Sequence, residues 1–420
     1  VSIDPQTHSL SAKDIITIAG SDPDLQLHLG TRFLFLEISQ GGNALEWEQI
    51  EAGSKSKAAR YFIRNWNPDG PPLAIRWQGS LPEFTGYGVS IIRPDLVELS
   101  GFCGWFPTIE PSSQSEQFTY TMSLEMPQGW TVLSPRDGAF KPDTGGTMKF
   151  INRSSQTQDI FICASPGFEQ HQIGAEDSPV LLYSAPREGL DQIKADFESV
   201  VALSTQWFGE PTKSEEIVAI ISPRGGGAEW GYERGIFWVS GDGFADYLLE
   251  HDWEAKGLKK SFAAHETIHT WFGKSLRFED AWLMEAVTQY LEVVITAQLF
   301  ELSNLPDRYF TWYRERFLAN DKAENTAISS LGIDDSHYDH WYLKGSWAFW
   351  DLEKHVGRQA LIAALSDLYR ERAGSVISRM EFTESFQTSL GTELALFFQH
   401  WFDDSGFQPV YRIDSSNTGS

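Results

Sequence analysis

Hydrophobic residues follow a strand-like pattern over the first 178 residues of the chain. Short runs rich in Val, Ile, Thr, Phe and Tyr alternate there with turns rich in Gly, Pro, Asp and Ser. The clearest runs are residues 14–18, 32–38, 59–64, 73–77, 118–124, 148–151 and 159–163. Short strands at this spacing are typical of an all-β domain of the sandwich type. We therefore predict an all-β domain over residues 1–178.

The pattern changes after residue 178, where helical spacing takes over. Apolar strands are expected at residues 180–183 and 217–222, and the remainder is mostly helical. Residues 190–207 place Phe197, Val200 and Leu203 mostly on one helical face. Further helical patterns cover residues 260–271, 282–302, 345–372 and 382–402. We predict that residues 179–420 form a mainly helical domain with a small sheet, which makes the chain an α+β multidomain protein.

The acidic excess of the chain excludes one class of partner. Among 420 residues, 33 are Lys or Arg and 58 are Asp or Glu, which gives a net charge of −25. Such a surface would not release counterions from a phosphate backbone, so no nucleic-acid partner is expected. The excess serves solubility, or it includes an acidic site for a cationic ligand. Since no apolar run approaches about 18–20 residues, no membrane span is expected either.

The cysteines and the start of the chain leave the compartment open. Cys103 and Cys163 lie 60 residues apart. They could pair or stay thiols, and their spacing is not that of a cysteine-based metal site. The sequence begins at Val1 without an initiator methionine, and it shows no secretory leader. This start favours an exported, periplasmic protein over a cytoplasmic one. The oligomeric state is not indicated.

One motif carries chemistry. Residues 265–269 read His-Glu-Thr-Ile-His and lie inside a helical pattern. Residues four apart on a helix differ by only about 40° around its axis, so the imidazoles of His265 and His269 can face one point. Two neutral imidazoles suit Zn²⁺, and Glu266 between them can take a proton from a water at the metal. The pattern therefore predicts a catalytic zinc site.

A catalytic zinc needs a third protein ligand and one open position. Glu285 lies 16 residues after His269 in a second helical pattern, and a two-helix hairpin could bring it to the histidines. Glu279, Asp280 and Glu292 compete with it on spacing alone. Glu292 is two turns beyond Glu285 and is better placed to accept a hydrogen bond from the far nitrogen of a ligand histidine.

Four segments resemble the signatures of the aminopeptidase N family of zinc metallopeptidases, the gluzincins. Residues 265–273, His-Glu-Thr-Ile-His-Thr-Trp-Phe-Gly, resemble its HExxH-x-WFG signature. Residues 282–292 are similar to its WLNEGFASYLE segment, residues 226–231 to its GAMEN exopeptidase motif, and residues 341–345 to its YEKG element. The segments occur in the family's order, and the resemblance covers essentially the whole chain.

The resemblance implies a fold and a set of roles. The fold would be an N-terminal antiparallel β-sandwich or saddle domain, followed by a thermolysin-like catalytic domain. One Zn²⁺ per chain would be held by His265, His269 and Glu285. Glu266 would be the general base, and Tyr342 would stabilise the oxyanion. Tyr338 is a neighbouring candidate for the tyrosine.

The resemblance also implies a site for the substrate's free N-terminus. Glu229 follows a glycine-rich stretch, in which Gly226, Gly227 and Ala228 would lie along the bound peptide. Its carboxylate would pair with the α-ammonium, with Glu98 as a second acidic group from the N-terminal domain. The expected partners are therefore peptides with a free N-terminus.

Two departures from the family keep other functions in view. The family has 18 residues between the second histidine and the glutamate ligand, whereas residues 270–284 number 15 here. Family members also continue into further domains where this sequence ends, so we expect a more open active site. The alternatives are a glycyl-aminopeptidase-like enzyme or an endopeptidase on the same scaffold, an epoxide-hydrolysing or bifunctional relative, and a catalytically silent peptide-binding module.

Overall fold

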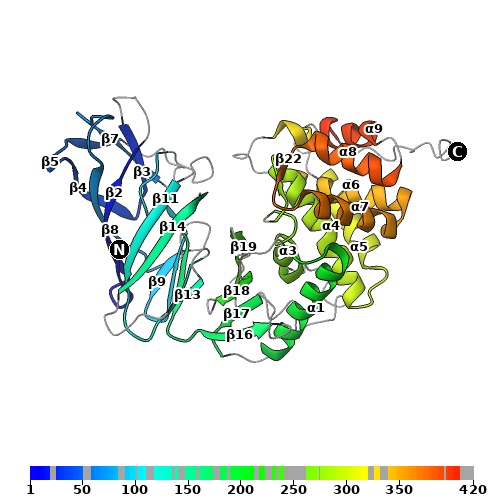
Figure 1. Ribbon diagram of the computed structural model, residues 1–420, viewed down its shortest axis with the longest axis horizontal. Helices are drawn as coiled ribbons and strands as arrows, with labels where there is room; N and C mark the ends of the chain where they lie inside the picture. The colour runs from blue at the N-terminus through cyan, green and yellow to red at the C-terminus, as the bar shows by residue number, and fades with distance from the viewer. Residues whose placement is uncertain are drawn as a thin grey trace. The chain divides into compact units, whose positions relative to one another are not determined.

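A computed structural model divides the chain into two units, coloured from blue to red along the sequence in Figure 1. The first comprises Val1–Gln170 and Tyr183–Pro186, and the second comprises His171–Leu182 and Arg187–Ser420. The structure describes residues 1–18, 25–50, 58–83, 90–100, 103–109, 118–134, 138–140, 147–157, 160–173, 180–186, 190–211, 217–222, 229–232, 236–240, 262–273, 275–319, 326–331, 339–391 and 394–406. The predicted domain boundary at residue 178 lies outside these residues and stays a prediction.

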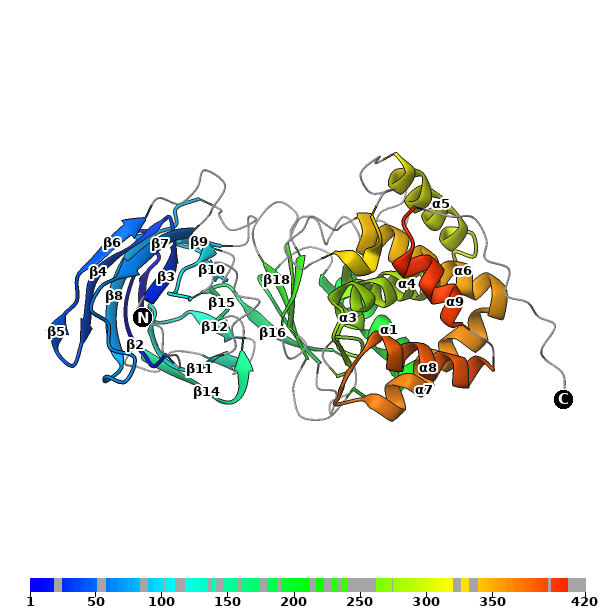
Figure 2. The ribbon, with the colours of Figure 1, turned by 90° about the horizontal axis from the view of Figure 1, so that it is seen from above.

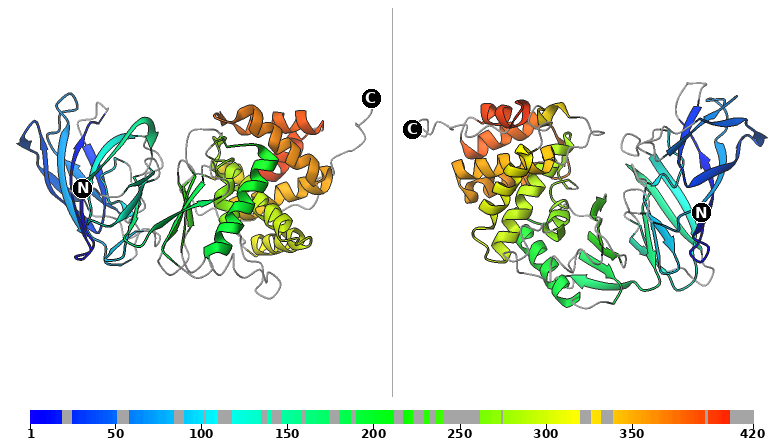
Figure 3. Two further views of the ribbon diagram at one scale, coloured as in Figure 1. Left: turned by 60° about the horizontal axis from the view of Figure 1, so that its bottom comes forward. Right: turned by 180° about the vertical axis from the view of Figure 1, so that it is seen from behind.

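The first unit is built from β-strands in the part of the chain that the structure describes (Figure 3). Its sheets have the orders β14-β11-β1-β2-β8-β4-β5, β13-β12-β15-β10-β9 and β3-β7-β6. Neighbouring strands are antiparallel, except that β1 pairs in parallel with β11. The strands are β1 (Ser2–Asp4), β2 (Ser9–Ile16), β3 (Leu25–Gly30), β4 (Phe33–Gln40), β5 (Asn43–Ala44), β6 (Trp47–Ile50), β7 (Ala58–Ile63), β8 (Leu73–Ser80), β9 (Ile91–Arg93), β10 (Leu96–Leu99), β11 (Phe118–Glu125), β12 (Thr131–Ser134), β13 (Gly138–Phe140), β14 (Thr147–Thr157) and β15 (Ile162–Ser165).

Alternating burial along β8 shows how the sequence pattern builds this unit. Leu73, Ile75 and Trp77 are buried in its core, whereas Arg76 and Gln78 are exposed. Successive side chains of a strand point to opposite faces, so a period of two buries one face and leaves the other in water. The sheets therefore enclose an apolar core of their own.

Both cysteines lie in this unit. Cys103 and Cys163 are buried, and no disulfide joins them. The thiol of Cys103 donates to the carbonyl oxygen of Ser100 at 3.2 Å. Of the two arrangements that the sequence left open, the structure has two thiols.

The second unit combines a small sheet with helices. The sheet has the order β16-β17-β18-β20-β19, in which β18 and β20 are parallel and β19 and β20 are antiparallel. Its strands are β16 (Glu169–Ile173), β17 (Val180–Ser184), β18 (Ile217–Ser222), β19 (Glu229–Tyr232) and β20 (Ile236–Ser240). A pair of two-residue strands, β21 (Arg277–Phe278) and β22 (Val376–Ile377), joins two distant helical segments in parallel.

Helix α4 forms the centre of the helical part. It packs against α1, α3, α5, α6 and the π-helix η4, and α1, α3 and α4 lie side by side in Figures 1 and 2. No helix among the described residues is long and apolar enough to cross a membrane. The helices are α1 (Leu190–Phe208), α3 (Phe262–Ile268), α4 (Ala281–Leu299), α5 (Leu305–Leu318), η3 (Ile328–Ser330), η4 (Asp339–Gly345), α6 (Ser346–Val356), α7 (Arg358–Arg372), α8 (Arg379–Leu390), α9 (Ala395–Phe398) and η5 (Gln399–Asp403).

A β-unit followed by a mainly helical unit with a small sheet confirms the predicted fold class, but two of the predicted helices are wrong. The helix expected over residues 345–372 is divided into α6 and α7 by Gly357, whose φ is 85°. The helix expected over residues 382–402 is interrupted after α8 by Gly391, whose φ is 62°. Glycine adopts this left-handed conformation without the penalty that a Cβ atom brings, and it ends helices for that reason.

Candidate metal centre and active site

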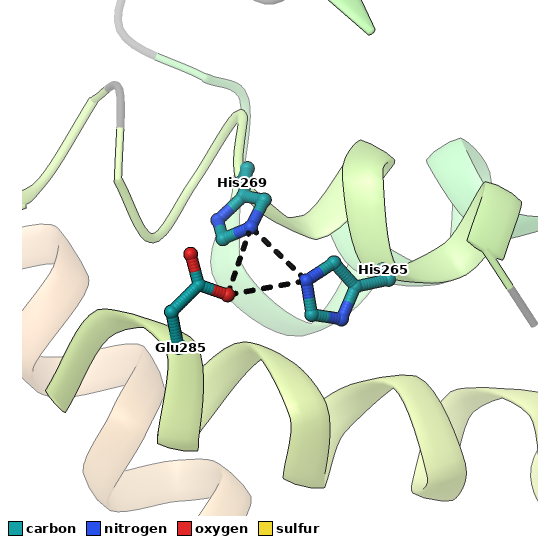
Figure 4. Close-up of side chains that lie close together, drawn as sticks. All are labelled: His265, His269 and Glu285. Carbon is teal, nitrogen blue, oxygen red and sulfur yellow. Dashed lines mark hydrogen bonds and ion pairs between the residues drawn. The ribbon is translucent and has the colours of Figure 1, made fainter. Parts of the chain in front are cut away.

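Helix α3 brings two imidazoles together. His265 is within α3, and His269 follows its last residue, but the N–H of His269 still donates to the carbonyl oxygen of His265 at 3.3 Å and keeps the helical turn. The Nε2 atoms of the two rings are 3.2 Å apart, and Figure 4 shows the rings pointing toward each other. Each histidine is 6% exposed. The HExxH spacing therefore brings the two imidazoles together on one side of the helical turn, as helical geometry predicts.

Helix α4 supplies the third donor. Its Glu285 Oε2 lies 3.3 Å from His265 Nε2 and 3.5 Å from His269 Nε2 (Figure 4). The three candidate ligand atoms lie within 4.8 Å of one another, and no second such group of three occurs among the described residues. Glu279 and Asp280, which competed on spacing, are not part of it. A linker of 15 residues is thus long enough to bring the glutamate to the histidines.

These residues fit a zinc ion. Two imidazole nitrogens and one carboxylate oxygen are the donor set of many catalytic zinc sites, which keep a fourth position open. Glu285 Oε2 is buried, and its neighbours at 3.3 and 3.5 Å are the Nε2 atoms of the two histidines. A buried carboxylate oxygen in that state is costly unless a cation or a donor reaches it. The three donors therefore converge on one point, where a cation would satisfy them.

The electrostatics of the cluster give the same result. Burial lowers the pKa of His265, but hydrogen bonds with Glu285 and Glu292 outweigh it and raise that pKa to about 10. Burial raises the pKa of Glu285, but the charge of His269 and its hydrogen bonds with both histidines bring it well below its usual value. The cluster thus stabilises positive charge strongly, and a metal cation would bind there in place of a proton.

The far nitrogen of each histidine is also held. His265 Nδ1 lies 3.1 Å from Glu292 Oε2, and Gln289 Nε2 donates to the same oxygen. His269 Nδ1 lies 3.2 Å from the carbonyl oxygen of Phe272 and 3.3 Å from the hydroxyl of Thr288. Hydrogen bonds at Nδ1 fix the ring and direct Nε2 toward the shared point.

The sequence analysis named Glu292 for such a contact but missed Thr288 and Gln289. Both follow Glu285 at helical spacing, three and four residues later, and both are fully buried. A polar residue one turn beyond a candidate ligand on an otherwise apolar helix is the signal that would have found them.

Glu266 is part of the same buried region. It lies on α3 between the two histidines and is 8% exposed, and its Oε2 is buried without a hydrogen-bond partner. A carboxylate oxygen in this state is ready to accept a proton or a hydrogen bond. The role of Glu266 as the base stays a prediction.

Tyr342 comes from a π-helix. Residues 339–345 form η4, and the ring of Tyr342 lies beside that of His265, with 5.9 Å between centroids and 32° between planes. A Cβ atom on Gly345 would lie only 2.8 Å from the Cβ of Ala286, so glycine allows η4 to approach α4 next to Glu285. The structure thus brings Tyr342 to the histidines. Tyr338 lies outside the described residues.

The residues predicted for the substrate's amino group are described only in part. Glu229 is the first residue of β19, its backbone pairs with Val239 of β20, and both strands pack against α3. Gly226, Gly227 and Ala228 lie outside the described residues. Glu98 is fully buried in β10 of the first unit. The substrate-binding roles of Glu229 and Glu98 stay predictions.

Comparisons with known proteins agree with this site. Residues 250–401, which include α3, α4 and η4, match the sequence model of the peptidase family M1 domain. No curated protein matches the chain. Among solved structures, the chain is similar to yeast LTA4 hydrolase in complex with bestatin, at 16% identity and a TM-score of 0.63, over 98% of this chain and 68% of that one.

Two bacterial structures are similar over most of their own length. The M1 zinc metallopeptidase of Deinococcus radiodurans matches at 16% identity and a TM-score of 0.62, over 97% of this chain and 93% of that one. An aminopeptidase N family protein of Idiomarina loihiensis matches at 14% identity and a TM-score of 0.63, over 96% and 75%. At these identities the likeness concerns the fold.

The fold, the site and the family match together define the class of the protein. A peptidase family M1 domain lies over the segment that holds the cluster of two histidines and a glutamate. Residues 250–401 thus match a peptidase family M1 domain, which agrees with the metallopeptidase that the sequence motifs predict.

Proposed function

We propose that the protein is a zinc-dependent aminopeptidase that hydrolyses the N-terminal peptide bond of peptides. One zinc ion per chain would be held by His265, His269 and Glu285. The observation that carries the proposal is the convergence of their three donor atoms, which lie within 4.8 Å of one another in a buried cluster. Such a site is built for a cation rather than for the stability of the fold.

The roles of the surrounding residues follow from their chemistry. When bound, zinc would polarise the scissile carbonyl and make a nearby water more acidic. Glu266 accepts the proton of the attacking water and passes it to the leaving amine. The phenol of Tyr342 donates a hydrogen bond to the oxygen on which negative charge develops. Glu292 and Gln289 keep the ring of His265 in place.

Recognition of the free amino group would limit the enzyme to the first residue of a peptide. In this proposal Glu229 pairs with the α-ammonium, helped by the backbone of Gly226, Gly227 and Ala228. Peptide substrates are supported by the Deinococcus radiodurans M1 enzyme, whose E323A mutant was solved with the substrate Tyr-Ser-Ala, at 16% identity and a TM-score of 0.61.

The central test is Glu266→Gln, assayed on aminoacyl-coumarin substrates with and without a chelator. The variant should bind zinc normally, because Glu266 is not a proposed ligand, and kcat should fall by about 10²–10⁴ or more. Chelation should abolish the activity of the wild type. Full activity of the variant, or full activity without metal, would refute the mechanism, and a chain that binds no zinc would favour the silent peptide-binding module.

A second variant tests the exopeptidase part separately. Glu229→Ala should keep its zinc but lose activity on aminoacyl substrates, because a charge-assisted hydrogen bond to the α-ammonium is removed. An N-acetylated peptide should remain uncut by the wild type. Cleavage of that peptide would favour the endopeptidase, and a strict preference for N-terminal glycine would favour the glycyl-type enzyme.

The likeness to yeast LTA4 hydrolase brings forward a second candidate, hydrolysis of an epoxide substrate at the same site. It would use the same cation site and would also be lost on chelation. Product analysis with LTA4 beside the peptide panel separates the two activities. Turnover of the epoxide without cleavage of any aminoacyl substrate would replace the aminopeptidase proposal.

A further inference from the structure

A buried lysine lies on the same π-helix as Tyr342. Lys344 is 1% exposed, and its Nζ donates to the backbone carbonyl oxygen of Asp404 at 2.7 Å. The two residues are 60 positions apart, so the contact joins η4 to the segment that follows η5. A lysine is rarely buried to this degree without a specific partner.

The segment that receives this hydrogen bond is itself fixed. Asp403 forms an ion pair with Arg379 at the start of α8. The carboxylate of Asp404 lies 3.3 Å from His400 Nδ1. Both aspartates also attract the ammonium of Lys344, whose pKa is nevertheless lowered to about 8 by burial. The ammonium is thus held by a backbone carbonyl oxygen at a cost in solvation.

The other contacts of η4 lie toward the site. Gly345 lets the π-helix approach Ala286 of α4, next to Glu285. The hydroxyl of Ser346 donates to the carbonyl oxygen of Tyr342. A π-helix is a rare conformation that is frequent at functional sites, so we expect tertiary contacts to determine its register. The contact of Lys344 with Asp404 and the packing of Gly345 on Ala286 are two such contacts, both just after Tyr342 in the chain.

We propose that Lys344 is a positioning residue for Tyr342. Its ammonium, bound to the carbonyl oxygen of Asp404, fixes the register of η4 and so places the phenol where the oxyanion of the reaction develops. The proposal rests on the proposed function, because it needs Tyr342 to act in catalysis. Lys344 itself touches neither substrate nor metal in this account.

A double-mutant cycle on the zinc-loaded full chain tests this coupling. The variants are Lys344→Met, Tyr342→Phe and their combination, with kcat and KM measured on an aminoacyl-coumarin substrate. Lys354→Met is the matched control, since Lys354 on α6 is a half-exposed lysine paired with Asp307 at 2.9 Å. Zinc content and thermal unfolding are measured for every variant.

The expected result is a loss that depends on Tyr342. Lys344→Met should lower kcat by about 10- to 100-fold, because a small misplacement of a catalytic group costs that much, while KM and zinc content stay unchanged. In the Tyr342→Phe background the same substitution should change kcat by less than about threefold, since residues that act as a unit are not additive. Lys344→Arg, which keeps the cation and its donors, should recover part of the loss, and Lys354→Met should have no effect on kcat.

Other results would overturn the proposal. An equal loss in both backgrounds would mean that Lys344 acts on the fold or the metal site, and the proposed function would stand without this role. An unchanged kcat would exclude the role directly. If Tyr342→Phe alone keeps full activity, the oxyanion role of Tyr342 fails and the positioning role fails with it. If Lys344→Met does not fold, Lys344→Gln takes its place in the cycle with the same expectations.

Discussion

Two parts of the second unit follow opposite rules. Helix α8 begins with a capping box, in which the Ser378 hydroxyl accepts from the N–H of Glu381 and the Glu381 carboxylate accepts from the N–H of Ser378. It ends at Gly391 in the left-handed conformation, and it buries only Phe382 and Phe386. We define the site wall as α4 and η4. Helix α4 lacks such local signals, because no side chain caps its first residue and most of its residues are buried.

The difference lies in the polar residues that the site wall buries. Thr288, Gln289 and Glu292 are at most 1% exposed on α4, and Lys344 is 1% exposed on η4. Burial removes the hydration of each of these side chains. This loss lowers the free energy of unfolding unless a hydrogen-bond partner compensates for it. Conflicts between local rules and the observed structure are expected at functional sites. The site wall is therefore less stable than it could be, because its polar residues are placed for the site. Helix α8, which contributes no residue to the cluster of donors, follows the local rules of helix stability.

The pH dependence of stability tests the clearest of these costs. The pKa of Lys344 is about 8 in the folded protein against 10.5 as the ordinary value, so between these pH values the unfolded chain binds more protons. The free energy of unfolding should therefore rise with pH through this window, by an amount on the order of 3 kcal/mol from this group. Below pH 8 both states are protonated, and the cost is constant.

The measurement compares wild type with Lys344→Met by urea unfolding at pH 7 to 10. The stability of the wild type relative to the variant should increase toward high pH. Lys354→Met gives the pH dependence of a general Lys→Met change. A difference between wild type and Lys344→Met that stays flat would contradict the cost assigned to the buried ammonium.

Loss of the carboxylate behind His265 should have the next largest effect. Glu292→Gln keeps the size of the side chain but removes the charge that holds the imidazole, so zinc affinity should fall by about 10- to 100-fold, or about 1.4–2.7 kcal/mol. Competition with a chromogenic chelator measures it. Glu315→Gln on α5 is the control, because Glu315 is exposed. Equal zinc affinity of wild type and Glu292→Gln would remove Glu292 from the site.

What the sequence could predict follows the same division between local and distant contacts. His265, His269 and Glu285 follow helical spacing on two helices, and the structure brings their donor atoms together as that spacing required. Helix α5 was missed although Tyr309, Tyr313 and Phe317 recur every four residues and are all buried. That signal is local, and a closer analysis of periodicity would have found it.

The π-helix and the contact of Lys344 could not have been predicted in this way. With seven residues, η4 is too short for a π-helical pattern of apolar residues to be told from an α-helical one. The partner of Lys344 is a backbone carbonyl 60 residues later, and a carbonyl leaves no trace in the sequence. The breaks at Gly357 and Gly391 are intermediate cases, because glycine is visible in the sequence but its positive φ is not.

The smallest expected effect lies in α8 and concerns stability alone. Ser378→Ala removes the hydroxyl that accepts the N–H of Glu381 at 3.3 Å, and the loss of such a cap costs about 1 kcal/mol. Since α8 contributes no residue to the cluster of donors, zinc affinity and kcat should stay as in the wild type. Urea unfolding and the aminoacyl-coumarin assay on one preparation measure stability and kcat together.

Thr388→Ala, near the end of the same helix, is the control for a lost hydroxyl outside the cap. The Thr388 hydroxyl donates to the Glu384 carbonyl oxygen within the helix. If Ser378→Ala also lowered zinc affinity or kcat, the separation between a helix shaped by local rules and a site wall shaped by function would not hold.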